Sequence, residues 1–328
     1  MARGAEGDWP GQRRTAALAV AALVTLLWST SWVLIKVGLD DLSLPPLSFA
    51  GLRYALATLV LLPIAWPSLR RVAWHSVGSR LRWRVVLLGV LLYAVTQGAQ
   101  FAALVHLPAV AVSLALSTTP VVVAIVGLRG REAPSRTQVA GAAAVAIGAT
   151  LYFAPLDLGS GAALGLVVAA IGVAANAAAA VLGRTLARDA LTALGGALGL
   201  TTLSMAAGSV PLLLVGLAID GPPTLTAQAW LIIAWLALVN TAIAFSLWNH
   251  SLRTLTAVES SVMNNLMLVQ IAALAWIFLG ESLDGRELIG LAIALAGIVA
   301  VQLPFAVRAR LKVAAGAAGE ITPTEPPG

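Results

Sequence analysis

Cysteine is absent from the 328 residues. Without a thiol, the chain cannot form disulfides, use a thiolate nucleophile or bind zinc through cysteine. Histidine occurs three times, at His75, His106 and His250, and these positions fall in a basic loop, an outer turn and an inner helix end. No cluster of metal ligands is therefore expected, and the sequence predicts neither a metal nor a cofactor.

Charge is also scarce, because only 10% of the residues are Asp, Glu, Lys or Arg whereas 59% are hydrophobic. Soluble globular proteins average about 25% charged residues, so a water-soluble enzyme is excluded. An intramembrane enzyme would need acid–base or nucleophilic groups that converge within the membrane. Glu259 is the one carboxylate expected there, so this alternative is disfavoured and we expect a protein without enzymatic activity.

Long apolar windows account for the composition. A hydrophobic stretch of about 18 residues or more can cross the hydrocarbon core of a bilayer as a helix. The expected spans are residues 18–39, 47–66, 83–105, 108–128, 136–154, 162–183, 192–217, 227–249, 256–278 and 286–305. The sequence therefore predicts an all-α integral membrane protein with ten transmembrane helices, flanked by an N-terminal tail at 1–17 and a disordered tail at 306–328.

The basic residues give the orientation, because cytoplasmic loops accumulate Lys and Arg. Seventeen of the 20 would lie on one side: Arg3, Arg13, Arg14, Arg70, Arg71, Arg80, Arg82, Arg84, Arg129, Arg131, Arg136, Arg184, Arg188, Arg253, Arg308, Arg310 and Lys312. Arg286 would lie on the other side, and Lys36 and Arg53 fall within spans. This distribution predicts a multi-pass protein of the cell membrane with both termini in the cytoplasm. It also argues against nucleic acid as a partner, since the charge follows a membrane surface instead of a groove.

The two halves of the chain resemble each other. A common offset of 149 residues relates five pairs: Glu132 and Glu281, Ser135 and Asp284, Gln138 and Glu287, Gly141 and Gly290, Gly148 and Gly297. An offset of 148 relates Gly51 to Gly199 and Pro63 to Pro211. We therefore expect two repeats of five helices, at 18–154 and 162–305. An odd number of helices places the second repeat in the membrane upside down, as in secondary transporters with alternating access.

Two short motifs within the repeats indicate helix starts. Ser135-x-x-Gln138 and Asp284-x-x-Glu287 have the form of a capping box, so they should begin spans five and ten. The preceding Glu132 and Glu281 are expected in hydrated turns at the membrane boundary. The glycines that follow in both spans offer small surfaces, suited to close helix packing or to a homodimer.

These motifs resemble a known family. The run Leu27-Trp28-Ser29-Thr30-Ser31-Trp32 followed by Lys36, the Pro46 and Arg53-Tyr54 of span two, and the twice-repeated Gly and Glu turn are similar to the EamA-type family of the drug/metabolite transporter superfamily. The resemblance covers about residues 18–303. It implies a ten-helix transporter of small metabolites, often amino acids or related compounds, in the cytoplasmic membrane.

A binding site for such a solute should consist of polar groups near the bilayer midplane, at the interface of the repeats. Residues near the middle of their spans and slightly outside it supply these groups: Trp28, Ser29, Thr30, Ser31, Trp32, Gln97, Gln100, Asn176, Asn240, Asn264, Asn265 and Gln270. The alternative for any one of them is a hydrogen bond between helices, worth about 0.6 kcal/mol.

Lys36 and Arg53 are the two basic residues inside spans. We predict that Arg53, with Lys36, attracts an anionic group of the solute on the outer half of the pathway. The alternative for Lys36 is to reach the headgroups or to pair with Asp40 or Asp41. Glu259 is a candidate for proton coupling, or alternatively a cap at the start of span nine.

The sequence thus favours a secondary transporter, with export the preferred direction, that moves a small organic metabolite by alternating access among membrane lipids. No Gly-x-x-x-x-Gly-Lys-Ser/Thr loop for ATP occurs, so the energy would come from a gradient or transport would be facilitative. A flippase for lipid-linked or isoprenoid carriers is the closest rival. It would be distinguished by an apolar opening towards the lipid.

Overall fold

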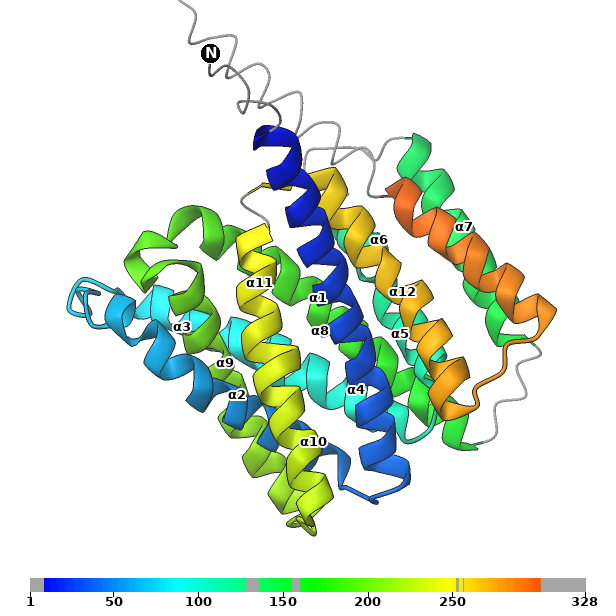
Figure 1. Cartoon of the computed structure of the whole chain (residues 1–328), viewed down its shortest axis with the longest axis horizontal. Helices are drawn as coiled ribbons and strands as arrows, with labels where there is room; N and C mark the ends of the chain where they lie inside the picture. Colours follow the sequence, from blue (N-terminus) through cyan, green and yellow to red (C-terminus); the bar gives the residue numbers. More distant parts are fainter. Residues whose placement is uncertain (1–8, 128–135, 155–159, 252–253, 256, 302–328) are drawn as a thin grey trace, which may run out of the picture.

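The computed structural model describes all residues except 1–8, 128–135, 155–159, 252–253, 256 and 302–328, and every regular element within the described residues is helical (Figure 1). The first half contains α1 (Trp9–Asp40), α2 (Pro46–Leu69), α3 (Ser79–Gly89), η1 (Val90–Thr96), α4 (Gln97–Leu104), α5 (Ala109–Ser117), α6 (Thr119–Gly127) and α7 (Arg136–Phe153). The second half contains α8 (Ser160–Asp189), η2 (Thr192–Leu194), α9 (Gly196–Ile219), α10 (Ala227–Ala237), η3 (Leu238–Ile243), α11 (Ala244–Ser251), α12 (Ala257–Leu279) and a last helix at 285–301.

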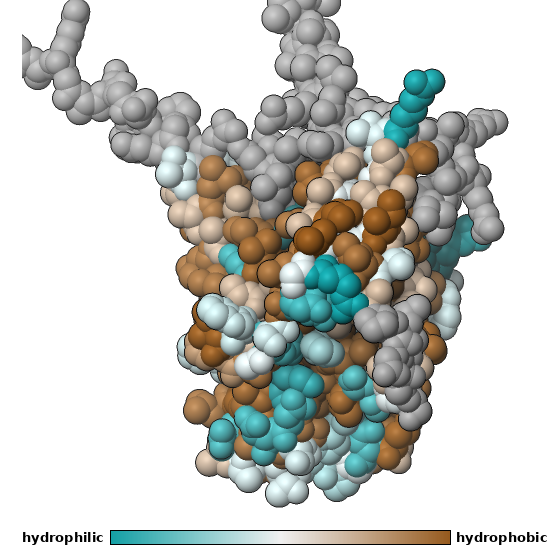
Figure 2. Space-filling view, turned by 90° about the vertical axis from the view of Figure 1, so that its right-hand side faces the viewer, coloured by the Kyte–Doolittle hydropathy of each residue, from teal (hydrophilic) through white to brown (hydrophobic). Residues whose placement is uncertain are grey.

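Five of these helical stretches are long and apolar enough to cross a membrane: Thr15–Asp40, Pro46–Leu69, Ser79–Leu104, Gly161–Ala187 and Gly196–Ile219. Shorter apolar helices run over Ala109–Val123, Ala227–Ile243 and Met263–Leu279. Figure 2 shows that hydrophobic side chains cover much of one face, whereas hydrophilic ones gather towards its lower end. The chain is accordingly an all-α, multi-pass membrane protein.

The N-terminal boundary differs from the expected tail at 1–17, because α1 begins at Trp9. Pro10 stands in the first turn, where a proline costs no intrahelical hydrogen bond, and Gly11 after it does not end the helix before the apolar segment. Residues 9–17 of the expected tail are therefore helical, whereas residues 1–8 lie outside the described residues. The C-terminal tail predicted at 306–328 lies outside the described residues.

Two π-helical segments occupy corresponding places in the halves. The segment η1 joins α3 to α4, and η3 joins α10 to α11, each without interrupting the helix. Their first residues, Val90 and Leu238, are 148 residues apart, which equals the offset found for Gly51 and Gly199. Thr96 donates to the carbonyl of Leu91 at 2.7 Å within the first segment. Such π-helical turns often occur at functional sites.

Glycine allows the closest helix contacts. At Gly51 in α2, a Cβ atom would lie 2.5 Å from the Cα of Leu213 in α9, so the two backbones touch. Gly148 of α7 makes a similar approach to the last helix, where a Cβ would lie 2.5 Å from the carbonyl oxygen of Gly290. Small residues permit this proximity in membrane helices. The glycines in spans five and ten thus pack against each other within the chain, and Figure 1 shows α7 beside the last helix.

A break separates α5 from α6 at Thr118. Pro120 lacks a backbone N–H and therefore leaves a carbonyl of the preceding turn without its usual donor. The hydroxyl of Thr119 donates to the carbonyl of Leu116 at 2.6 Å, and that of Thr118 donates to the carbonyl of Ala115 at 2.6 Å. Side-chain hydroxyls thus satisfy the backbone where the helix is interrupted.

Candidate functional site

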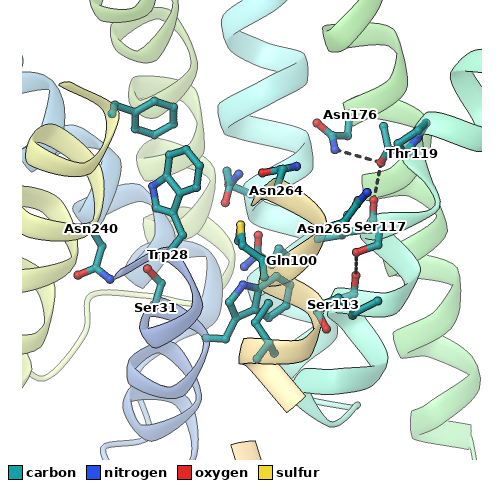
Figure 3. Close-up of a pocket in the computed structure, with 18 of the residues that line it drawn as sticks. Trp28, Ser31, Gln100, Ser113, Ser117, Thr119, Asn176, Asn240, Asn264 and Asn265 are labelled. Carbon is teal, nitrogen blue, oxygen red and sulfur yellow. Dashed lines mark hydrogen bonds between the residues drawn. The ribbon is translucent and has the colours of Figure 1, made fainter. Parts of the chain in front are cut away.

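A cavity of about 410 Å³ lies inside the helix bundle, between segments from both halves (Figure 3). The side chains that line it come from α1, α2, α4, α5, α6, α8, η3, α11 and α12: Trp28, Ser31, Trp32, Arg53, Tyr54, Gln97, Gln100, Ser113, Leu116, Ser117, Thr119, Pro120, Asn176, Asn240, Phe245, Asn264, Asn265, Met267, Leu268 and Ile271. Amide, hydroxyl and aromatic groups predominate. This volume lies within the range of sites for small molecules.

Most residues expected from the sequence meet in this cavity. They are Trp28, Ser31, Trp32, Arg53, Gln97, Gln100, Asn176, Asn240, Asn264 and Asn265. Their helices are far apart along the chain, and the fold brings them around one space. Ten of the residues predicted for the site therefore line one cavity.

Ser29, Thr30 and Gln270 were also expected in the site but are not among the lining residues. The hydroxyl of Ser29 is buried and lies 2.8 Å from the carbonyl oxygen of Thr25 and 3.0 Å from Oε1 of Gln270, so it can donate to either acceptor. Ser29 and Gln270 thus join α1 to α12. The hydroxyl of Thr30 accepts a hydrogen bond from Nδ2 of Asn240 at 3.0 Å. These residues connect helices, which was the alternative role for each of them.

Lys36 also lies away from the cavity lining. Its Nζ forms an ion pair with Oδ2 of Asp40 at 3.1 Å and donates to the carbonyl of Leu104, the last residue of α4, at 2.7 Å. The spacing of four residues places both charged groups on one face of α1. Lys36 and Arg53 were both expected to attract an anion. Arg53 lines the cavity, whereas Lys36 does not. The side chain of Glu259 lies outside the described residues.

One wall of the cavity is a series of hydroxyl and amide groups. Nδ2 of Asn176 in α8 donates to the hydroxyl of Thr119 at 3.1 Å, and the hydroxyl of Ser117 donates to the carbonyl of Ser113 at 2.7 Å. Figure 3 shows these four side chains in a row. A side chain of the second half thus contacts the break between α5 and α6 of the first half.

Aromatic rings form another part of the lining. The ring of Trp28 lies 5.3 Å from that of Phe245 and 5.3 Å from that of Trp248, centroid to centroid, in tilted arrangements. Such tilted pairs are favourable geometries for aromatic side chains. The cluster joins α1 to α11 and presents Trp28 and Phe245 to the cavity.

Arg53 is the one charged side chain among the described residues of the lining. It is 5% exposed, and its Nη2 lies 3.5 Å from the hydroxyl oxygen of Thr241 in η3. Its guanidinium carbon lies 5.0 Å from the ring centroid of Tyr54, within the range of a cation–π contact. Tyr54 in turn donates to Oε1 of Gln97 at 2.7 Å. Aromatic and amide groups thus surround a positive charge.

Sequence reasoning did not select Tyr54, Ser113, Ser117, Thr119 or Phe245 for the site. Ser113 and Ser117 are four residues apart, which places both on one helical face. That spacing is the signal by which they could have been found. Tyr54 directly follows Arg53, and no pattern in the sequence distinguishes it from an aromatic residue at the lipid surface.

Polar contacts join distant segments at the end of the bundle where α1 and α9 terminate. Oδ2 of Asp220 accepts from the backbone N–H of Leu47 at 2.7 Å, in the first turn of α2. The hydroxyl of Ser48 donates to the carbonyl of Gly221 at 2.8 Å. The first N–H groups of a helix have no intrahelical acceptor. Asp220 therefore supplies the acceptor that the N–H of Leu47 lacks within α2.

The connection to the last helix contains the predicted capping box. The backbone N–H of Glu287 donates to Oδ1 of Asp284 at 2.7 Å, and that of Asp284 donates to Oε2 of Glu287 at 2.9 Å. The backbone N–H of Glu287, with Arg286 nearby, lowers the pKa of the Asp284 carboxyl below its ordinary value. The predicted capping box of Asp284 and Glu287 is therefore confirmed. Ser135 of the other motif lies outside the described residues.

The described residues contain no group of three or more His, Asp or Glu side chains that could hold a metal ion. The chemistry available in the cavity is accordingly that of hydrogen bonds, aromatic surfaces and one guanidinium. Such groups can bind and orient a small polar solute.

Comparison with known proteins gives the family. The model of the EamA-like transporter family matches the chain twice, at residues 15–154 and 163–303. A permease-like protein of Bacillus subtilis (strain 168), YdzE, is 37% identical over 67 residues, which are 20% of this chain and 86% of that protein. A solved crystal structure aligns over 88% of this chain and 98% of its own, with a TM-score of 0.58 and 18% identity, and so shares the fold. The chain belongs to the EamA-like transporter family.

Proposed function

We propose that this transmembrane transporter carries a small organic metabolite, such as an amino acid or a related compound, by alternating access about the cavity. The observation that carries the proposal is the cavity itself. Many amide and hydroxyl groups line it within an apolar bundle, and both halves contribute to its lining. A lipid-exposed bundle has no need of so many convergent amide and hydroxyl groups unless they bind something.

Ten membrane crossings in two halves of opposite orientation would provide the movement. The equal offset of η1 and η3 supports this arrangement, as does the packing of α2 against α9, its counterpart in the other half. In addition, α1 packs on α12 while α8 packs on α5 and α6, so contacts recur with the halves exchanged. Inverted repeats of this kind can exchange two shapes around a fixed central site.

The charge distribution supports a location in the cell membrane with cytoplasmic termini. In this orientation, the contacts of Asp220 and Lys36 would close the outer end of the bundle. Such a cavity would exchange solute with the cytoplasm in this state, and the direction that we propose for net transport is export.

Ligand-dependent thermal stabilisation of the purified protein tests the proposal. A metabolite that binds the folded state should raise the unfolding temperature in a concentration-dependent way. Hits would then be assayed for counterflow in proteoliposomes. Asn176→Leu should weaken both signals because it removes an amide from the lining. Thr150→Val is the matched control, since Thr150 is exposed on α7 and is not a lining residue. Binding without counterflow would argue against transport.

Proton coupling through Glu259 is the proposed energy source. Net uptake driven by an imposed pH gradient should disappear in Glu259→Gln. Solute exchange without a pH gradient should persist in that variant. Transport that is indifferent to the pH gradient in the wild-type protein would contradict this part of the proposal.

A further inference from the structure

Three buried polar atoms have no hydrogen-bond partner within the described part of the chain. They are Oγ of Ser31, Nε of Arg53 and Oδ1 of Asn240. All three side chains line the same cavity, and each is at most 5% exposed. Buried polar atoms in folded proteins are nearly always hydrogen-bonded, so a cluster of exceptions at one cavity indicates a missing partner.

The charge of Arg53 indicates which kind of partner is missing. No described residue of the cavity lining is acidic, and the described partners of Arg53 are the hydroxyl of Thr241 and the rings of Tyr54 and Phe101. A buried cation without a carboxylate nearby is costly and is normally retained only where it pairs with something.

The second half has no charge at the corresponding place. The corresponding residue of the second half, at the offset of 148, is Thr201, which is neutral and does not line the cavity. Arg53 therefore breaks the similarity between the halves at a position that lines the cavity. A role in recognising a solute accounts for this asymmetry.

We propose that the cavity binds a solute with a net charge of −1, whose carboxylate pairs with the guanidinium of Arg53. This inference rests on the proposed function and narrows its substrate class. One guanidinium balances one carboxylate, whereas a phosphate monoester carries about −1.5 to −2 at neutral pH. The ammonium of a zwitterionic amino acid would find no carboxylate among the described lining residues. A hydroxy acid or an N-acylated amino acid satisfies this balance.

The remainder of the lining describes the rest of the solute. Trp28, Trp32 and Phe245 offer aromatic surfaces, while Asn176 and Gln100 offer amides that can bind a hydroxyl or an amide N–H. The solute therefore combines a carboxylate with an apolar or aromatic body that carries a polar substituent. The hydroxyl of Ser31 is a further donor to its oxygen atoms.

Shape-matched probes test the charge requirement. Thermal unfolding of the purified full-length protein is followed against rising phenylacetate, N-acetylphenylalanine, neutral phenylacetamide and zwitterionic phenylalanine at constant ionic strength. We expect saturable stabilisation by the two carboxylates and a response at least about tenfold weaker for the other two, because a charge-assisted hydrogen bond is lost or opposed. Equal or stronger stabilisation by phenylacetamide or phenylalanine would overturn the inference, as would no response to either carboxylate.

Two variants place the effect at Arg53. Arg53→Gln should weaken the apparent affinity for the carboxylates about 10- to 100-fold, whereas Arg53→Lys should retain part of it. Arg286→Gln is the control, because Arg286 is a surface residue paired with Asp284 outside the cavity. If Arg53→Gln unfolds, Arg53→Lys still decides, since an unchanged carboxylate affinity in that variant would contradict the pairing.

The metabolite screen distinguishes a failure of the anion site from a failure of the transporter proposal. If a neutral or cationic metabolite binds and is transported with equal efficiency by Arg53→Gln, the transporter proposal stands and the anion site is wrong. If no metabolite of any charge binds or is transported, both proposals fail.

Discussion

The carboxylate of Glu281 accepts a hydrogen bond from the backbone N–H of Ala109 at 2.7 Å, although the two residues are 172 positions apart. Oε2 of the same side chain accepts from the N–H of Val110 at 3.3 Å. Glu281 follows α12 in the second half, and Ala109 begins α5 in the first. A residue expected only in a hydrated turn therefore caps a helix of the other half.

Removal of this cap should destabilise the protein. Loss of a helix cap typically costs about 1 kcal/mol, and a negative charge near a helix N-terminus adds a favourable interaction with its dipole. We expect Glu281→Ala to lower the free energy of unfolding by about that amount and Glu281→Gln to lower it by less, because an amide oxygen can still accept. Thermal unfolding in detergent measures both, and an unchanged Glu281→Ala protein would contradict the role.

Gly148 should not tolerate a side chain. In most helices, Gly→Ala stabilises by up to about 1 kcal/mol. Here a Cβ would collide with the backbone at Gly290 in the last helix. We therefore expect Gly148→Ala to destabilise the protein and to lower its unfolding temperature. Gly183→Ala in α8 is the matched control, because its Cβ would meet only Cδ1 of Leu88 at 3.6 Å. Equal responses of the two variants would show that the close approach has no energetic importance.

The capping box should make a contribution that depends on pH. Hydrogen bonding from the N–H of Glu287 lowers the pKa of Asp284 in the folded protein below the ordinary value of 3.8. This stabilisation is fully present above the ordinary value and is lost as pH falls through the folded value. Between neutral pH and about pH 3, wild-type protein should therefore lose more stability than Asp284→Asn, whose amide oxygen caps without titrating. Parallel pH profiles of unfolding temperature would count against this.

The absence of cysteine allows a direct test of orientation. Ser76 and Thr224 are exposed in the connections after α2 and after α9. We expect an impermeant maleimide to label Thr224→Cys in intact cells and Ser76→Cys only in inverted vesicles. The unsubstituted chain is the control, because it has no thiol to label. Labelling of both variants from the same side would contradict the proposed crossings.

The segment of each helix that contributes to the cavity could be predicted from the sequence, but the rotation about each helix axis could not. Asn176 and Asn240 were expected in the site and line the cavity, whereas Ser29 and Gln270, which were also expected there, bond to each other between helices. Hydropathy places a residue along a helix. It does not determine which face contacts a neighbour, because helices surrounded by both lipid and protein have weak polar asymmetry.

Local geometry was predictable where the chemistry is local. The capping box at Asp284 and the pairing of Lys36 with Asp40 depend on residues three or four positions apart. The π-helical segments were not predictable, because one additional residue per turn leaves no mark in apolar composition. The cap from Glu281 to Ala109 also depends on tertiary packing that no short motif specifies.

The pairing of α7 with the last helix has a consequence for how such transporters diverge. Among the described residues that line the cavity, none belongs to these two helices. Their glycines restrict them to one mutual fit, while Ile147 and Ile289 face outward and are 60% and 57% exposed. Substitutions of the lining residues therefore fall in the other helices and leave the contact between these two unchanged. Substitutions within α7 and the last helix are limited chiefly by the shape of the contact between these two helices and by their contact with lipid.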